Sequence, residues 1–368
     1  MADSTNTDRE LLVRANERGP FAKLGAFLRL SGPGWLQSAI TLGGGSLGGA
    51  LYLGVLGGRH MLWLQLVAIV IGVIMLSAIA YVTLSTRVRP YLAINQYVNP
   101  VLGVGWITAT ILANMIWILP QFSLCFDTLN QNLLPGTIQD NFASQAWVSG
   151  ILGTAAFLVV ILSFNPGWMS KLFDLLLKLF VGLIVVCFVA AIVYLVSQGE
   201  INLGSIWSSF IPDFSQWNNP SPDIAALINA APETWQTWWH DKIINQQQKV
   251  IIGTTATAVG INMTFLLPYS MIARGWDKPY RGLARFDLIT ALAIPFVVVT
   301  SCIVLASAYT FHAKADDAFL SSDVTVIQES PFFRESLDVL EERLIEARGE
   351  DALATIAAMP NESAEEQE

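Results

Sequence analysis

The stretch TLGGGSLGGALYLGVLGG, residues Thr41–Gly58, decides the fold, because it is apolar enough to enter a membrane and yet is crowded with glycine. Each glycine costs about 1 kcal/mol of helix propensity relative to alanine, so a helix that only crosses a bilayer gains nothing from them. Gly43, Gly44 and Gly45 could let the backbone leave helical geometry at membrane depth, where freed peptide groups become ligands. Alternatively, spacings such as Gly45 and Gly49 could allow helices to pack closely. Both interpretations are open at this point.

The whole chain has the composition of a membrane protein with several spans. Of its 368 residues, 53% are hydrophobic and 13% are charged, and the mean hydropathy is +0.51. Soluble domains carry charge on roughly a quarter of their residues. Hydrophobic stretches long enough for about 30 Å of hydrocarbon predict an all-α integral membrane protein with seven transmembrane helices. We place these helices at about 34–57, 61–86, 101–127, 146–164, 171–197, 250–273 and 286–311.

The distribution of Lys and Arg predicts the orientation of these helices. Residues 1–30, a segment with an amphipathic stretch, carry several basic residues, as do the connections after the second, fourth and sixth spans. The alternate connections are poor in Lys and Arg, so the positive-inside rule places the N-terminus in the cytoplasm. Residues 31–311 are then the membrane domain, with a tryptophan-rich outer loop at 198–249, and residues 312–368 are an acidic segment outside.

The predicted sixth span is irregular as well. The stretch TTATAVGINMTFLLPYSMIARG, Thr254–Gly275, has Gly260, Asn262, Thr264 and Pro268 in its middle, so it combines helix breakers with polar groups at depth. The simplest role for Asn262 is a hydrogen bond to a neighbouring helix. Two interrupted spans, the first and the sixth, are also what an inverted repeat of five helices predicts, with a binding site between the breaks.

The first two spans resemble those of the Nramp (natural resistance-associated macrophage protein) family of divalent-metal transporters. That family begins with Gly-Pro-Gly-aromatic, which Gly32–Trp35 match, and reaches an Asp-Pro-Gly-Asn motif, whose positions fall on Gly43–Ser46. Its Met-Pro-His segment falls on Asn262–Thr264. The resemblance covers about residues 25–311. It implies a LeuT-like fold with broken first and sixth helices, and alternating-access transport across a bacterial inner (plasma) membrane.

The metal ligands that this resemblance implies are replaced here. In the family the Asp, the Asn and the Met bind the metal, with a backbone carbonyl at the position of Val259, but this chain has Gly43, Ser46 and Asn262 in place of those side chains. Met263 lies one position away. Such a site suits a largely hydrated cation or a small polar solute better than a tightly dehydrated Mn²⁺, and the expected substrate is a divalent metal such as Mg²⁺ or Mn²⁺ or a small polar solute. The predicted substrate-binding residues are Gly43, Gly44, Gly45, Ser46, Val259, Asn262 and Thr264, and the candidate metal ligands are Ser46, Asn262 and Met263.

Other polar residues in the spans give weaker signals. The third span has Asn114 and Gln121 at depth where the family has acidic residues, so no proton relay is evident. Asp174 and Lys178, four residues apart, are predicted to pair with each other. The three cysteines have no metal or redox spacing, and we expect all of them to be buried.

Two functions remain open. The chain is either the N-terminal part of a diverged Nramp-like secondary transporter, or a membrane scaffold or regulatory subunit that keeps the fold without the site. The family is built from two inverted repeats, so the missing helices would come from a continuation of the chain or from a second subunit, and we expect this chain alone not to transport. Its expected partners are the transported cation or solute and the lipid bilayer. We expect no enzymatic activity, no cofactor and no nucleic acid.

Overall fold

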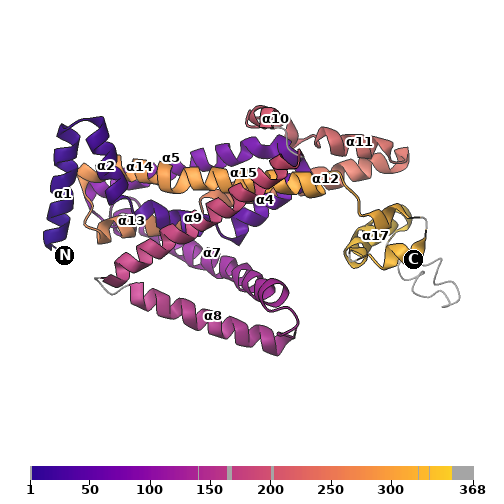
Figure 1. Cartoon of the computed structure of the whole chain (residues 1–368), viewed down its shortest axis with the longest axis horizontal. Coiled ribbons are helices and arrows are strands. Elements are labelled where there is room, and N and C mark those ends of the chain that lie inside the picture. Colours follow the sequence, from indigo (N-terminus) through magenta and orange to yellow (C-terminus); the bar gives the residue numbers. More distant parts are fainter. Residues whose placement is uncertain are drawn as a thin grey trace. The chain divides into compact units, whose positions relative to one another are not determined.

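The computed structural model describes residues 2–139, 141–163, 168–199, 203–321, 323–330 and 332–349 (Figure 1). These residues form helices joined by short connections, with no strand in those ranges. The chain divides into two compact units, Met1–Ala313 and Lys314–Glu368.

Among the described residues, six segments are long and apolar enough to cross a membrane, where the sequence predicts seven. The difference arises because Gly44–Thr86 is one continuous run of 43 helical residues that contains most of the first two predicted spans. At 1.5 Å per residue such a run is about 65 Å long, roughly twice the hydrocarbon thickness. The segments are Gly44–Thr86, Pro100–Leu133, Phe142–Ile161, Leu172–Ser197, Glu233–Ala273 and Lys278–Phe311.

The first part of the chain begins with two short helices ahead of the membrane domain. Proline occupies the first turn of α2 and of α3, where its missing N–H costs nothing. Gly58 ends α4 in the left-handed region, at φ 57°, which favours glycine. The elements are α1 (Ala2–Glu17), α2 (Pro20–Leu30), α3 (Pro33–Thr41), α4 (Gly44–Gly57), the 3₁₀ turn η1 (Gly58–Met61) and α5 (Leu62–Thr86).

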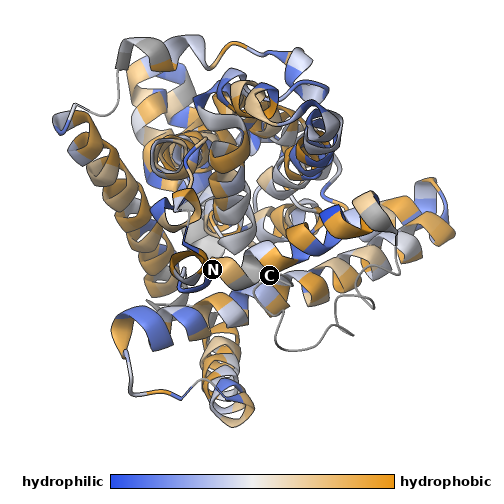
Figure 2. Cartoon of the chain, turned by 90° about the vertical axis from the view of Figure 1, so that its right-hand side faces the viewer, coloured by the Kyte–Doolittle hydropathy of each residue, from blue (hydrophilic) through white to orange (hydrophobic). Residues whose placement is uncertain are grey.

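The central helices are the most exposed part of the first unit. Figure 1 shows α8 at the edge of the bundle beside α7. Figure 2 shows that the long helices consist mostly of hydrophobic residues. Many of those in α7, α8 and α9 are exposed, as expected of surfaces that face lipid. The elements are α6 (Pro90–Tyr97), α7 (Pro100–Asp127), the π-helical turn η2 (Thr128–Leu133), α8 (Phe142–Ser163) and α9 (Trp168–Ser197).

The sixth predicted span begins earlier than its hydropathy indicates. Helix α12 starts at Glu233, inside the predicted outer loop, rather than near residue 250. The first turns of α12 are too polar for hydropathy to predict a span there. They contain no helix breaker, so the helix begins several turns before its apolar part. The loop also contains α10 (Leu203–Ser208), η3 (Phe214–Trp217) and α11 (Pro222–Ala230), and it is followed by α12 (Glu233–Ala258) and α13 (Ile261–Ala273).

The last helix of the first unit is the centre of its core. Helix α15 packs most extensively on α4 and α9, and its residues Phe296, Val299 and Val304 are fully buried. Of the cysteines, only Cys302 in α15 is buried. Cys125 and Cys187 are exposed on outward surfaces, so the prediction that all three are buried is wrong. The closing elements are η4 (Lys278–Tyr280), α14 (Arg281–Asp287), the π-helical turn η5 (Leu288–Ala293) and α15 (Ile294–Phe311).

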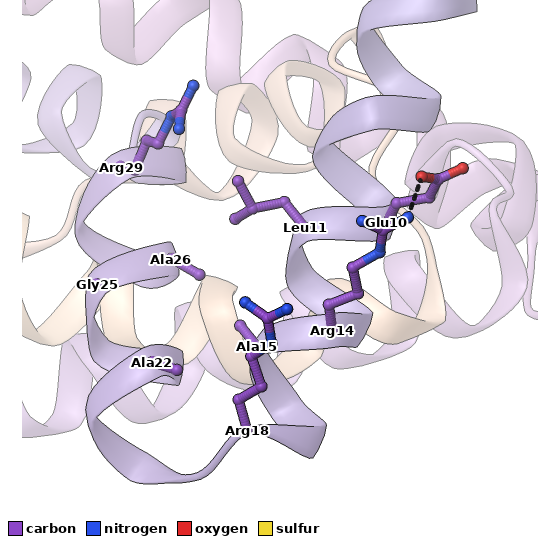
Figure 3. A pocket seen from close by; sticks show the side chains of 9 residues that line it. All are labelled: Glu10, Leu11, Arg14, Ala15, Arg18, Ala22, Gly25, Ala26 and Arg29. Carbon is purple, nitrogen blue, oxygen red and sulfur yellow. Dashed lines mark hydrogen bonds and ion pairs between the residues drawn. The ribbon is translucent and has the colours of Figure 1, made fainter.

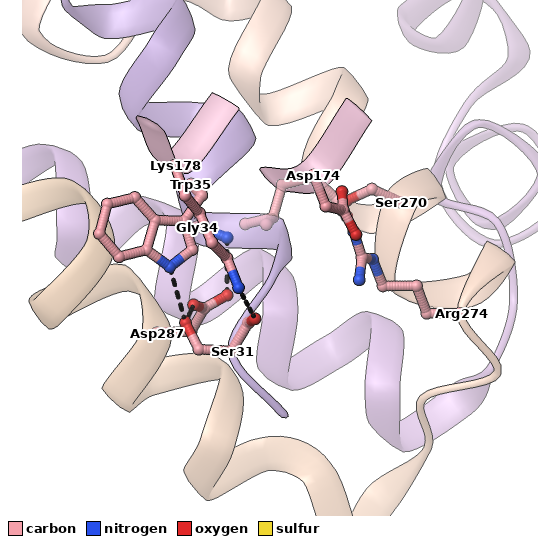
Figure 4. A network of polar contacts seen from close by, with 9 residues as sticks. Ser31, Gly34, Trp35, Asp174, Lys178, Ser270, Arg274 and Asp287 are labelled. Atoms are coloured by element: carbon pink, nitrogen blue, oxygen red, sulfur yellow. Dashed lines mark hydrogen bonds and ion pairs between the residues drawn. The ribbon is translucent and has the colours of Figure 1, made fainter. Parts of the chain in front are cut away.

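A buried carboxyl group anchors the start of α3. The side chain of Asp287, 2% exposed at the end of α14, accepts a hydrogen bond from the hydroxyl of Ser31. Its second oxygen accepts the backbone N–H of Gly34 at 2.6 Å, and the indole of Trp35 donates to Ser31 Oγ at 3.1 Å (Figure 4). This network ties the first turn of α3 to α14.

The pairing predicted between Asp174 and Lys178 is wrong. Asp174 instead accepts two hydrogen bonds from Arg274 at the end of α13, at 2.8 and 2.9 Å. Lys178 donates to the backbone carbonyl of Ser31 at 3.3 Å. Spacing along one helix could not reveal these partners, because both lie outside α9: Arg274 directly follows α13, and Ser31 directly follows α2.

The second unit is described as far as residue 349. It contains η6 (Asp317–Leu320), α16 (Val324–Gln328) and α17 (Phe333–Arg348). Asp316 and Asp323 cap the first two of these elements by accepting the N–H groups of Ala318 and Thr325. The polar end predicted beyond α17 lies outside the described residues.

Candidate functional site

The first helix interruption lies inside the glycine-rich stretch. Helix α3 ends at Thr41, and α4 begins at Gly44, with Gly43 extended at φ −99° and ψ 178°. Any residue can adopt that conformation, so the backbone itself does not require glycine there. The next two glycines lie against side chains of α7: an added Cβ on Gly44 would overlap the Leu124 side chain, and one on Gly45 would overlap the Trp117 ring, so a larger residue at either position requires that side chain to move.

The second interruption lies between α12 and α13. Val259 and Gly260 are both extended, at φ −142° and −77°, so the helix stops at Ala258 and restarts at Ile261. The Asn262 side chain accepts the backbone N–H of Met263 at 2.9 Å. Asn262 thus bonds within its own first turn, and the interhelical hydrogen bond considered for it is not observed among the described residues.

The two interruptions meet each other. The Ser46 hydroxyl donates to the carbonyl of Thr257 at 2.9 Å. The Thr41 hydroxyl lies 3.4 Å from the carbonyl of Ala258 and 3.1 Å from the sulfur of Met263. The last carbonyls of a helix have no partner within it, so hydroxyls of the first interruption satisfy the carbonyls that the second leaves open.

A small cavity lies between the interruptions and α7. Its volume is about 30 Å³, enough for a single water-sized particle. Hydroxyl, amide, carbonyl and thioether groups surround it, and no charged side chain is among the residues that line it. These residues are Ile40, Thr41, Gly43, Gly45, Ser46, Trp117, Gln121, Thr257, Gly260, Asn262 and Met263.

The structure brings most of the predicted residues together. Gly43, Gly45, Ser46, Asn262 and Met263 all line the cavity. The others do not line it: Gly44 faces Leu124, the Val259 side chain packs over Gly72 of α5, and the Thr264 hydroxyl donates to the carbonyl of Ile261 at 2.6 Å.

Sequence reasoning missed the contribution of α7 and of two threonines. Gln121 and Trp117 reach the cavity from α7, and Thr41 and Thr257 reach it from the ends of α3 and α12. The amide of Gln121 was visible as a polar group at depth, but the sequence does not show that it faces the glycines. Threonines are common at helix ends, so Thr41 and Thr257 carry no distinct signal.

Buried polar groups continue beyond the cavity in both neighbouring helices. Gln37 and Ser38 lie one turn before Thr41 in α3, and Thr254 lies one turn before Ala258 in α12. All three are at most 1% exposed, and their side-chain polar atoms have no hydrogen-bond partner among the described residues. Such groups are normally satisfied by water or a ligand.

Comparison with known proteins adds the family. No curated protein and no solved structure matches the chain. The family model described as natural resistance-associated macrophage protein-like (Nramp) matches residues 34–325, which is most of the chain and includes both interruptions and the cavity between them. The six apolar segments agree with an integral membrane protein. The chain therefore belongs to the Nramp family and is a metal-ion transporter of that class.

Proposed function

We propose that the transported metal ion binds in the cavity between the two helix interruptions and crosses the membrane by alternating access. The observation that carries this proposal is the contact between the interruptions: Ser46 bonds to Thr257, and Thr41 to Ala258 and Met263. Peptide groups that leave helical geometry at membrane depth are tolerated where they line such a cavity. Non-transporting scaffolds have no need of one, and the family match does not favour that alternative.

The proposed arrangement is LeuT-like, with seven crossings. The interrupted pairs α3–α4 and α12–α13, together with α5 and the run from α14 to α15, would move as a bundle against α7, α8 and α9. The glycines support this division, because Gly44 and Gly45 present bare backbone to Leu124 and Trp117 of α7. A surface without side chains lets one helix shift along another with little steric cost.

The lining favours a divalent cation held by neutral ligands. The oxygen donors are the Ser46 and Thr41 hydroxyls, the amides of Gln121 and Asn262, and the sulfur of Met263 adds a soft ligand. Mg²⁺ accepts oxygen ligands and keeps several waters, whereas Mn²⁺ also tolerates softer ones. The present volume of about 30 Å³ is too small for an organic solute or a hydrated ion, so entry requires the bundle and α7 to separate.

Polar groups beside the cavity support a hydrated route to it. In the part of the chain that the structure describes, the side chains of Gln37, Ser38 and Thr254 are buried and have no hydrogen-bond partner, which is costly unless water reaches them in another conformation of the bundle. They extend the polar lining from the ends of α3 and α12 into both helices. An ion could therefore exchange protein ligands for water over this distance rather than at one step.

Binding of Mn²⁺ to the purified chain is expected to be weak. With no carboxylate in the lining, we expect a Kd of about 1 mM or higher, a free energy of about −4 kcal/mol. Replacing Gly43 by Asp restores the acid that the family has at this position, and we expect it to tighten binding at least tenfold. An added Cβ at Gly43 would lie 3.3 Å from the backbone carbonyl of Ile40, which is a tight contact, so a shift of a few tenths of an ångström accompanies the substitution.

The matched control is Gly48→Asp, because Gly48 has nothing within 4 Å and does not line the cavity. Isothermal titration of the three proteins gives the comparison. Micromolar binding by the unchanged chain would contradict a site of neutral ligands. Equal gains from Gly43→Asp and Gly48→Asp would mean that the ion binds elsewhere.

The proposed topology places residue 141 outside and residue 89 inside the cell. In a background without Cys125, Cys187 and Cys302, Asn141→Cys is expected to react with an impermeant thiol reagent on intact cells, and Arg89→Cys only after lysis. Both positions are exposed, so accessibility in the protein does not differ between them. Labelling of residue 89 on intact cells would reverse the orientation predicted by the positive-inside rule.

A further inference from the structure

The helices that precede the membrane domain enclose a groove. Helix α1 docks through Leu12, which is 0% exposed and belongs to the hydrophobic core, and through an ion pair of 3.6 Å between Arg9 and Asp277. Helix α2 docks through Phe27, whose ring packs 5.3 Å from that of Phe286 in α14. The groove between α1 and α2 is therefore held by contacts to the membrane domain, and its volume is about 470 Å³.

The groove is positively charged. Arg14, Arg18 and Arg29 line it, against the single acid Glu10, so three positive charges and one negative leave a net charge of +2. Arg14 and Glu10 form an exposed pair of 3.3 Å, whereas the guanidinium groups of Arg18 and Arg29 have no partner among the described residues. Figure 3 shows the three arginine side chains around the open space. The floor consists of small residues: Ala15, Ala22, Gly25 and Ala26.

An exposed apolar surface lies directly beside the arginines. Phe21, Leu24 and Leu28 are 89%, 45% and 60% exposed, and their spacing of three and four residues puts them on one face of α2. At 100° per residue this face adjoins the one that carries Gly25 and Arg29. A helix with an apolar face and a basic face side by side is typical of the membrane interface.

The position of α2 brings this apolar face to the membrane. Helix α2 ends at Leu30, and α3, the first helix of the membrane domain, begins at Pro33. Only two residues separate them, so α2 must lie at the level where the first crossing starts. Phe21, Leu24 and Leu28 would be unfavourably exposed to water there, but they are satisfied when they enter the acyl region.

We propose that the groove between α1 and α2 binds the headgroup of an anionic phospholipid. The arginines contact the phosphate, because planar guanidinium groups match phosphate oxygens. The small residues of the floor leave room for the glycerol part, and the acyl chains run along Phe21, Leu24 and Leu28. The site thus fixes the N-terminal helices to one leaflet, independently of which ion the protein transports.

The test uses the full chain in detergent and short-chain dioctanoyl lipids measured by isothermal titration. Phosphatidylglycerol is expected to bind, and phosphatidylcholine at least tenfold more weakly. The triple variant Arg14→Gln, Arg18→Gln, Arg29→Gln should weaken phosphatidylglycerol binding about 100-fold. Glu10→Gln should act in the opposite direction and tighten it severalfold, because it removes the one negative charge among the described residues that line the groove.

The matched control removes three other exposed positive charges, with Arg89→Gln, Lys278→Gln and Arg285→Gln. An equal loss of affinity in this control would overturn the proposal, since attraction would then depend on total charge alone. If the triple groove variant does not fold, as judged by its thermal transition, the single variant Arg18→Gln replaces it. We expect Arg18→Gln to weaken phosphatidylglycerol binding about tenfold.

A final arm separates lipid from free phosphate. Phe21→Ser with Leu28→Ser should weaken phosphatidylglycerol binding at least tenfold and leave the binding of inorganic phosphate unchanged. The lipid assignment would be overturned if inorganic phosphate bound as tightly as phosphatidylglycerol and these two substitutions left the affinity for phosphatidylglycerol unchanged. The groove would then be a phosphate site.

Discussion

Gly54→Leu is expected to prevent the chain from folding, whereas Gly45→Leu is expected to leave it folded and abolish metal-ion uptake. Both glycines are in α4, yet their surroundings differ. An added Cβ on Gly54 would overlap the backbone carbonyl of Val304 and the hydroxyl of Ser307 in α15, where backbone cannot move aside. On Gly45 it would overlap the ring of Trp117, which is 37% exposed and has room to turn outward. The leucine would then fill the cavity of about 30 Å³.

The matched control is Gly48→Leu in the same helix, because an added Cβ on Gly48 meets nothing within 4 Å. The three substitutions have equal helix propensity, so differences between them report on contacts. Folding is measured as a single symmetric peak in size-exclusion chromatography, and uptake of Mn²⁺ and Mg²⁺ in cells whose chromosomal gene carries the change. Normal uptake by Gly45→Leu would remove the cavity from the transport route. A folded Gly54→Leu protein would mean that α4 and α15 are not packed as described.

The glycine-rich stretch contains glycines in two different surroundings, at a helix interruption and in contacts between helices. Its first glycines lie at the interruption and beside α7, and Gly49 and Gly54 lie against Thr254 and α15. The sequence alone could not assign these roles, because it does not show which residues contact each glycine. Which glycine has which role depends on the helices that pack against each face of α4, and those contacts join residues far apart in the chain.

The helical class, the membrane location and the family could all be predicted from hydropathy and the motif around Gly32–Trp35. Contacts between helices that are far apart in the chain could not be predicted from the sequence. Gln121 faces the glycines only because α7 crosses there, and Arg274 displaces Lys178 as the partner of Asp174 only because α13 ends beside α9. Local spacing favours pairs within one helix, whereas packing in the folded chain brings partners that are 100 residues apart in sequence.

Asp287→Ala is expected to destabilise the protein by about 3 kcal/mol or more, because it leaves two buried donors without their acceptor. The hydroxyl of Ser31 and the N–H of Gly34 both bond to this carboxyl group, which is 2% exposed. Asp287→Asn keeps the shape and one acceptor oxygen, but its NH₂ group cannot accept the N–H of Gly34. We therefore expect a smaller loss of about 1–2 kcal/mol.

The control is Asp174→Asn, which breaks the pair with Arg274 in the same region (Figure 4). The side chains of this pair are 28% and 34% exposed, so its loss is expected to cost no more than about 1 kcal/mol. Thermal unfolding in detergent should rank the midpoints as unchanged protein, Asp174→Asn, Asp287→Asn and Asp287→Ala, from highest to lowest. A midpoint of Asp287→Ala at or above that of Asp174→Asn would contradict this order. The start of α3 would then be held by the packing of Trp35 and its neighbours, because the buried carboxyl group would contribute too little to fix the helix that leads to the first interruption.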